Sequence, residues 1–248
     1  MTPRDRLLSA IHRRPVDRTA VGSATSVANL EQMDETGAAF PDVHPDGERK
    51  ACLAAGAHTI PGYNAIMPCF SIVAEASALG CEVDWGDRES MPAVRTFSWE
   101  DPAQVVTPED LLDRPPVRAV LDALRLLRAQ YPDRVALIGK AMGPRTLACR
   151  LHGVQQYLLE TLTDPEHVRA FLERLQGVTV LFGQAQLAAG ADVLCLANHA
   201  TGDRISARMY REFLLPLHRQ LTRRLACPTV LHICGNTLDP PDDIGTTG

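Results

Sequence analysis

The residues best suited to chemistry lie near the end of the chain, in segment 231–237, which reads Leu-His-Ile-Cys-Gly-Asn-Thr. The apolar run that leads into it, residues 228–234, is typical of a strand. Successive strand residues point to opposite faces, so His232 and Cys234 share one face. Zinc accepts both imidazole nitrogen and thiolate sulfur. The spacing therefore fits two zinc ligands, with a core histidine beside a buried cysteine as the structural alternative.

Four further residues are candidates to line a substrate pocket. Asn198 and His199 follow the apolar run 191–196, Gly143 follows the run 135–139, and Asn236 lies two residues after Cys234. The carboxyl ends of parallel strands form the binding sites of α/β proteins. For Asn198 and His199, an ordinary polar loop after a strand is the simpler interpretation.

The elements that must position these residues alternate short β-type runs with longer helical patterns, which is typical of a parallel sheet. Strands are expected at residues 17–21, 65–68, 135–139, 191–196 and 228–234, with a short hairpin within 82–97. No strand is followed by the glycine-rich turn of dinucleotide-binding folds. About five parallel strands, each followed by a helix, favour an incomplete (β/α)8 TIM-type barrel over an open sheet. Residues 1–248 are expected to form this single domain.

Helix boundaries and loops are also predictable from capping residues and prolines. Thr2 is expected to cap an opening helix, and residues 163–166 to start a long one. Other expectations are a loop at 33–45, a helix start at 107–110, one helix over 146–162, and a helix capped by Ser206 and kinked at Pro216.

Composition excludes several classes of protein. The 248 residues are 45% hydrophobic and 22% charged, with a net charge of −5, as in an ordinary globular protein. The acidic surplus argues against a nucleic-acid partner. No apolar stretch approaches the ~20 residues that span a bilayer, and residues 1–6 lack an apolar signal core. We therefore expect a cytoplasmic protein without a membrane segment.

Seven cysteines are present, at irregular spacings. An odd number in a large chain without a signal sequence does not indicate a disulfide framework. Most are expected to be small buried hydrophobic residues, with Cys234 as the exception.

Further motifs lie along the chain at residues 32–37, 40–41, 44–46, 75–81, 142–148, 204–210 and 232–237. Together they resemble the uroporphyrinogen decarboxylase superfamily, and within it the corrinoid-dependent methylcobalamin:coenzyme M methyltransferases. The resemblance implies a single (β/α)8 barrel with N-terminal additions. It also implies that His232 and Cys234 supply two zinc ligands, and that a cysteine far downstream supplies the third.

The same resemblance implies a zinc-dependent methyltransferase. In such an enzyme the zinc-bound thiol, such as coenzyme M, attacks the methyl group of a methylcobalamin-type corrinoid held by a separate corrinoid protein. Some relatives run the reaction in the other direction, from an O-methyl donor to the corrinoid. The sequence leaves the direction, the donor and the acceptor open.

Uroporphyrinogen decarboxylase, an enzyme of porphyrin biosynthesis, is the alternative within the superfamily. Decarboxylases carry an arginine-rich Met-Arg-Gln-Ala-Gly-Arg segment near the N-terminus, whereas residues 22–27 contain no arginine here. They also have Phe-Ser-Asp, and no Asp follows Phe70-Ser71 in this chain. A multiply anionic porphyrinogen needs several cations to bind it, so the missing arginines argue against that substrate.

The end of the sequence departs from the superfamily pattern. Relatives continue into further strands that supply the last cysteine ligand, whereas no cysteine follows Cys234 here and Pro240-Pro241 weakens the expected helix. We therefore expect an unfinished barrel that lacks the third zinc ligand. A catalytically inactive, truncated remnant is the third alternative.

Overall fold

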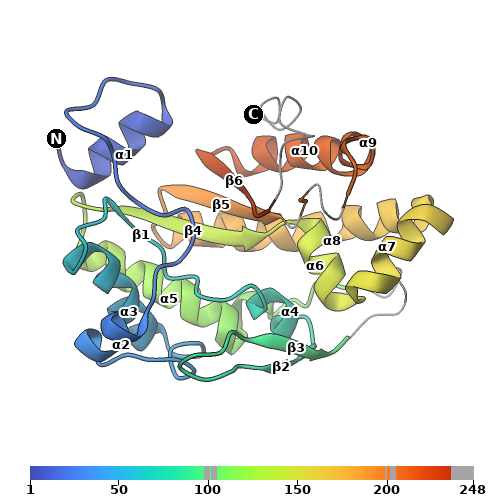
Figure 1. Cartoon of the computed structure of the whole chain (residues 1–248), viewed down its shortest axis with the longest axis horizontal. Coiled ribbons are helices and arrows are strands. Elements are labelled where there is room, and N and C mark those ends of the chain that lie inside the picture. Colours follow the sequence, from blue (N-terminus) through green and yellow to red (C-terminus); the bar gives the residue numbers. More distant parts are fainter. Residues whose placement is uncertain (98–100, 102–104, 199, 202–204, 236–248) are drawn as a thin grey trace.

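The computed structural model describes residues 1–97, 101, 105–198, 200–201 and 205–235 (Figure 1). Its centre is a parallel sheet with the strand order β1-β4-β5-β6. These strands are β1 (Ala65–Ile66), β4 (Ala136–Met142), β5 (Val193–Asn198) and β6 (Thr229–Ile233). All neighbouring pairs in this sheet are parallel, as the alternation of strands and helices predicts.

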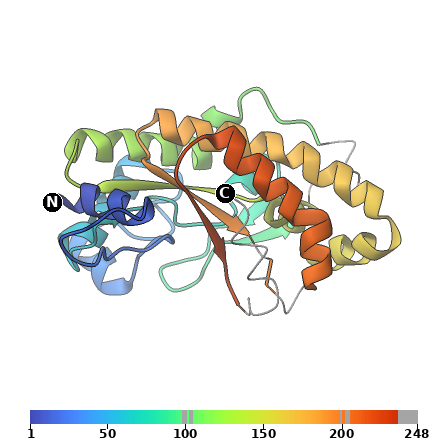
Figure 2. The same cartoon turned by 90° about the horizontal axis from the view of Figure 1, so that it is seen from above.

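The helices that connect the strands cover one face of the sheet. Helix α5 (Pro115–Gln130) precedes β4, and α6 (Pro144–Leu151), α7 (Val154–Thr163) and α8 (Pro165–Ala188) lead from β4 to β5. The connection from β5 to β6 contains α9 (Ala207–Met209), the π-helical turn η3 (Tyr210–Leu214) and α10 (Leu215–Leu225). Helices α5, α8 and α10 lie side by side (Figure 2), which is the outer layer of a (β/α) barrel.

The N-terminal part adds three helices beside the sheet. They are α1 (Pro3–Ile11), α2 (Leu30–Thr36) and α3 (Gly47–Thr59), of which α3 packs against α5. After β1 come the short helix α4 (Ala74–Ala78) and the hairpin of β2 (Glu82–Asp84) and β3 (Ala93–Thr96), where a hairpin is predicted. The 3-10 turn η2 (Leu111–Asp113) leads into α5.

Close packing of α8 on the sheet depends on two glycines. A Cβ at Gly139 of β4 would lie 2.8 Å from both the Gln186 amide oxygen and the Leu194 side chain. A Cβ at Gly183 of α8 would lie 2.7 Å from Leu225. Without these side chains, the helix sits directly on the strands and buries their apolar residues.

The strand predicted at residues 17–21 is wrong. Arg6 of α1 binds the Asp17 carboxylate at 2.6 Å, which ties this segment to the helix. Val21 bonds the residue before β1, donating its backbone N–H to Asn64 Oδ1 and accepting from the Asn64 N–H, both at 2.7 Å. The described residues therefore form four parallel strands, one fewer than expected.

Several helix boundaries also differ from the prediction. Helix α2 occupies part of the loop expected at 33–45, and the helix expected from 107–110 begins only at Pro115. Gly153 has a φ of 89°, which divides the single helix expected over 146–162 into α6 and α7. The helix that Ser206 caps is interrupted close to Pro216, as expected, because the π-helical turn η3 ends directly before α10, whose second residue is Pro216.

The helix starts predicted at Thr2, within residues 163–166 and at Ser206 are confirmed. The side chains of Thr2, Asp164 and Ser206 accept hydrogen bonds from backbone N–H groups three residues onward. Within the described residues, no helix combines the length and apolar character needed to cross a membrane.

Candidate active site

Strand register places the polar side chains on the sheet face opposite α8. Lys140 of β4 pairs with Cys195 of β5, and one row further along the same face Ala197 pairs with His232 of β6. Because paired residues in a ladder share a face, Lys140 and His232 lie on the same side of the sheet. In a (β/α) barrel this is the interior side.

The His232–Cys234 pair converges at the carboxyl end of β6. His232 Nε2 lies 2.9 Å from Cys234 Sγ. Burial, aided by the charge of Lys140, lowers the pKa of His232, which favours the neutral ring that a metal ligand requires. Cys234 is exposed, which does not fit the alternative of a histidine beside a buried cysteine. The pair therefore presents one nitrogen and one sulfur donor at an accessible position.

A third ligand does not accompany this pair in the part of the chain that the structure describes. No group of three or more His, Cys, Asp or Glu side chains there is arranged to hold a metal ion. The nitrogen and sulfur donors are of the type that zinc prefers. A catalytic zinc site has three protein ligands, so these two donors form an incomplete site. The assignment of His232 and Cys234 as zinc ligands remains a prediction.

Gly143 and Asn198 meet each other rather than the His232–Cys234 pair. A Cβ at Gly143 would lie 1.9 Å from Asn198 Oδ1, so only glycine fits here. Asn198 pairs with Ile233 in the ladder and therefore faces away from His232. Its amide is buried and makes no hydrogen bond in the described structure. The other two predicted lining residues, His199 and Asn236, lie outside the described residues.

A second polar region lies where the chain after β1 diverges from β4. Strand β1 pairs with β4 only through Ala65 and Ile66, so the edge of β4 beyond them lacks a strand partner. Side chains bind this edge instead. Gln186 bonds both the N–H and the C=O of Lys140, at 2.9 and 3.0 Å, and Glu75 Oε1 accepts the Met142 N–H at 2.9 Å. The divergence opens a narrow pocket beside β4.

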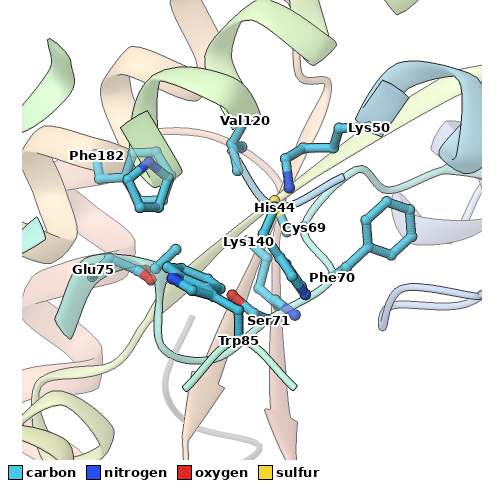
Figure 3. Close-up of a pocket in the computed structure, with 12 residues that line it drawn as sticks. His44, Lys50, Cys69, Phe70, Ser71, Glu75, Trp85, Val120, Lys140 and Phe182 are labelled. Carbon is cyan, nitrogen blue, oxygen red and sulfur yellow. The ribbon is translucent and has the colours of Figure 1, made fainter. Parts of the chain in front are cut away.

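We call this cavity the lysine pocket, lined among others by His44, Lys50, Cys69, Ser71, Trp85 and Lys140 (Figure 3). Lys50 comes from α3 and Lys140 from β4, and both are directed into the space between Phe70 and Trp85. The free space is about 10 Å³, which is the size that holds one water-sized group.

Burial perturbs the titratable groups of the lysine pocket. Burial, the largest cause, and the charge of Lys140 lower the pKa of Lys50 to about 8. Burial raises the pKa of the Cys69 thiol to about 11 and that of the Glu75 carboxyl, and it lowers the pKa of His44 to about 4. Cys69 therefore stays a neutral thiol at neutral pH. Groups with strongly shifted pKa values are common at functional sites.

The sequence interpretation missed this pocket, although one signal was present. Lys50 and Lys140 are the sole lysines among 25 basic residues, the others being arginines. Their convergence depends on packing between α3 and β4, which no local spacing reveals.

Comparison with known proteins identifies the family. Residues 2–248 match the family model "Uroporphyrinogen decarboxylase (URO-D)". The chain belongs to this family. It superimposes on a solved structure, "methyltransferase from Methanosarcina mazei", with a TM-score of 0.96 and 30% sequence identity, covering 100% of this chain and 74% of the other. This agreement supports the predicted barrel-type fold.

Methyltransferases stand out among the similar proteins of this family. A methylated-thiol–coenzyme M methyltransferase of Methanosarcina mazei is 36% identical over 96% of this chain and 65% of its own length. A methylcobamide:CoM methyltransferase of Methanosarcina acetivorans is 32% identical, over 100% of this chain and 74% of its own. A uroporphyrinogen decarboxylase of Xanthomonas campestris is 27% identical over 91% of this chain. The chain thus spans 65% of the length of the first relative.

Proposed function

We propose that this chain represents a zinc-dependent methyltransferase that moves a methyl group between a corrinoid protein and a thiol such as coenzyme M. The observation that carries the proposal is the 2.9 Å approach of His232 Nε2 and Cys234 Sγ at the carboxyl end of β6. Support for the reaction comes from relatives named as methylcobamide and methylated-thiol methyltransferases.

His232 and Cys234 are the residues that would hold zinc. When bound, the metal lowers the pKa of a coordinated thiol, so that a thiolate exists at neutral pH. The two side chains fix the site at the end of one strand, and the rigid sheet fixes its distance from the lysine pocket. Methyl transfer needs an activated nucleophile held in line with the methyl group, which is a positioning task.

The position of the pair also suits a macromolecular methyl donor. Cys234 is exposed and lies beyond the last residue of β6. A corrinoid carried by a separate protein could therefore approach this end of the sheet without passing through the core. Whether the methyl group travels toward the thiol or from it, the same approach is required.

The decarboxylase alternative has weaker support. The decarboxylase relative is 27% identical, against 36% and 32% for the two methyltransferases. The lysine pocket, at about 10 Å³, is far narrower than a tetrapyrrole. Its two lysines are the basic residues that line the pocket, whereas segment 22–27 contains no arginine.

Methyl transfer from methylcobalamin to coenzyme M tests the proposal, followed by the absorbance change of the corrinoid with zinc supplied. The matched variants are Cys234→Ser and Cys52→Ser, since both cysteines are exposed and only Cys234 lies beside His232. We expect transfer by the unaltered chain and by Cys52→Ser, and at least a hundredfold slower rate, about 3 kcal/mol, for Cys234→Ser. Absence of transfer by the unaltered chain, or equal rates for both variants, would overturn the proposal.

A further inference from the structure

One arginine, Arg145, is buried in the outer layer of the fold without a polar partner. It is the second residue of α6 and is 1% exposed. Within the described residues, its Nε, Nη1 and Nη2 atoms make no hydrogen bond and no ion pair. A guanidinium keeps its proton in proteins, so burial cannot neutralise it as it can a lysine or a histidine. An unpaired buried charge is strongly destabilising, so Arg145 requires a counter-charge.

The described groups around Arg145 do not supply that counter-charge. The ring of Tyr157 lies 5.6 Å from the guanidinium carbon, which is a cation–π contact. Burial raises the pKa of the Tyr157 hydroxyl, so it is neutral at neutral pH. Glu160 of α7 and Glu212 of η3 are the carboxylates of the adjoining elements, and each binds another side chain, at 2.8 and 2.7 Å. The charge of Arg145 is therefore left uncompensated by these elements.

Arg145 lines a small cavity between α6, α7 and η3. Tyr157 and Thr161 of α7 line it as well, and its apolar wall includes Phe213 and Leu214 of η3. The free space is about 10 Å³, which holds a single water-sized group. A carboxylate, sulfate or phosphate group has several heavy atoms, whereas a halide ion is a single atom. Size and charge together therefore select a monatomic anion.

We propose that this cavity binds a chloride ion, held by the Arg145 guanidinium. A water molecule would satisfy the N–H donors but would leave the charge uncompensated. Helices α6 and α7 follow β4 and η3 follows β5, so the ion would join the two connections that leave neighbouring strands. The inference does not depend on the proposed function, because neither His232 nor Cys234 lines the cavity.

Equilibrium dialysis of the full chain against radioactive chloride tests the site directly. We expect saturable, near-stoichiometric binding by the unaltered chain and loss of binding in Arg145→Met. Arg208→Met is the matched control, because Arg208 adjoins the cavity-lining Met209 in sequence but is 89% exposed, 3.9 Å from Glu212. This variant is expected to bind chloride as the unaltered chain does. Absence of saturable binding by the unaltered chain, or equal binding by Arg145→Met, would overturn the inference.

Urea denaturation at constant ionic strength gives a second measurement. Sodium gluconate replaces sodium chloride, because gluconate is too large for the cavity. A ligand that binds only the folded chain, present at about 100 times its Kd, raises the folded-to-unfolded ratio about a hundredfold. We expect the urea midpoint of the unaltered chain and of Arg208→Met to rise saturably with chloride, and that of Arg145→Met to stay constant. Equal midpoints of the unaltered chain in both salts would contradict the site, whether or not Arg145→Met folds.

Two further arms separate chloride from other sources of negative charge. Asp203 lies outside the described residues and precedes the cavity-lining Ile205 by two positions in sequence. If Asp203→Asn binds chloride and the unaltered chain does not, the counter-charge is a carboxylate of the chain and the inference is wrong. Bromide is expected to displace radioactive chloride at similar concentrations, and sulfate to leave it bound. Displacement by sulfate as effective as by bromide would contradict a site for a single atom.

Discussion

The His232–Cys234 pair and Lys140 of the lysine pocket lie on one sheet face, but the fold makes the pair and the pocket in different ways. The pair comes from a single strand at the sheet edge, and Cys234 is exposed. The lysine pocket joins α3, the segment after β1, and β4, and its lysines are buried. An exposed pair can bind a metal with little effect on folding, whereas buried charges cost stability.

Under the proposed function, the His232–Cys234 pair activates the sulfur of the thiol. The pair offers soft donors at an exposed position, whereas the lysine pocket is enclosed and holds only a small group. Methyl transfer then depends on how the rest of the fold positions the thiol against the methyl group.

The largest expected effect on stability comes from substituting the side chains that form hydrogen bonds with the unpaired edge of β4. Glu75→Ala leaves the buried Met142 N–H without its acceptor, so we expect a loss of about 1–3 kcal/mol in the free energy of unfolding. Glu75→Gln keeps an acceptor oxygen and is expected to lose less than about 0.5 kcal/mol. Urea denaturation of both variants measures the difference. Equal losses would show that the hydrogen bond to Met142 does not support the pocket.

A smaller effect is expected from pH. The pKa of Lys50 falls from its ordinary 10.5 to about 8, which means that the charged form of Lys50 destabilises the folded chain. That cost is fully present below about pH 8 and is relieved as the pH rises toward 10.5. Between pH 7 and 9 we expect Lys50 to add about 1 kcal/mol of stability.

The Lys50→Met variant isolates this contribution, because other groups titrate alike in both proteins. Between pH 7 and 9, the unfolding free energy of the unaltered chain should rise by about 1 kcal/mol relative to that of Lys50→Met. A difference that stays constant from pH 7 to 9 would mean that Lys50 keeps its ordinary pKa. Burial of Lys50 would then not reduce the stability of the fold, and the two regions would not differ in this respect.

Features that depend on neighbouring residues were predictable from the sequence. The caps at Thr2, Asp164 and Ser206 involve residues three positions apart, and His232 and Cys234 share a face because they are two positions apart on one strand. The family resemblance supplied the barrel-type fold and the proposed reaction, which no local pattern contains.

Features that depend on distant contacts were missed. The ion pair of Arg6 with Asp17 replaces the strand expected at 17–21, and the lysine pocket needs α3 to pack beside β4. Asn198 is the last residue of β5 rather than a residue after the strand, and the register turns it toward Gly143 and away from His232. Register and packing are set by the whole fold, and a single sequence does not reveal them.

Zinc content is the measurement that tests the central claim most directly. The chain is equilibrated with zinc, freed of excess metal and assayed for bound metal, alongside Cys234→Ser and Cys52→Ser. We predict near-stoichiometric zinc in the unaltered chain and in Cys52→Ser, and loss of zinc in Cys234→Ser with the fold retained. A chain that holds no zinc, or a Cys234→Ser variant that holds as much as the unaltered chain, would contradict the assignment of His232 and Cys234.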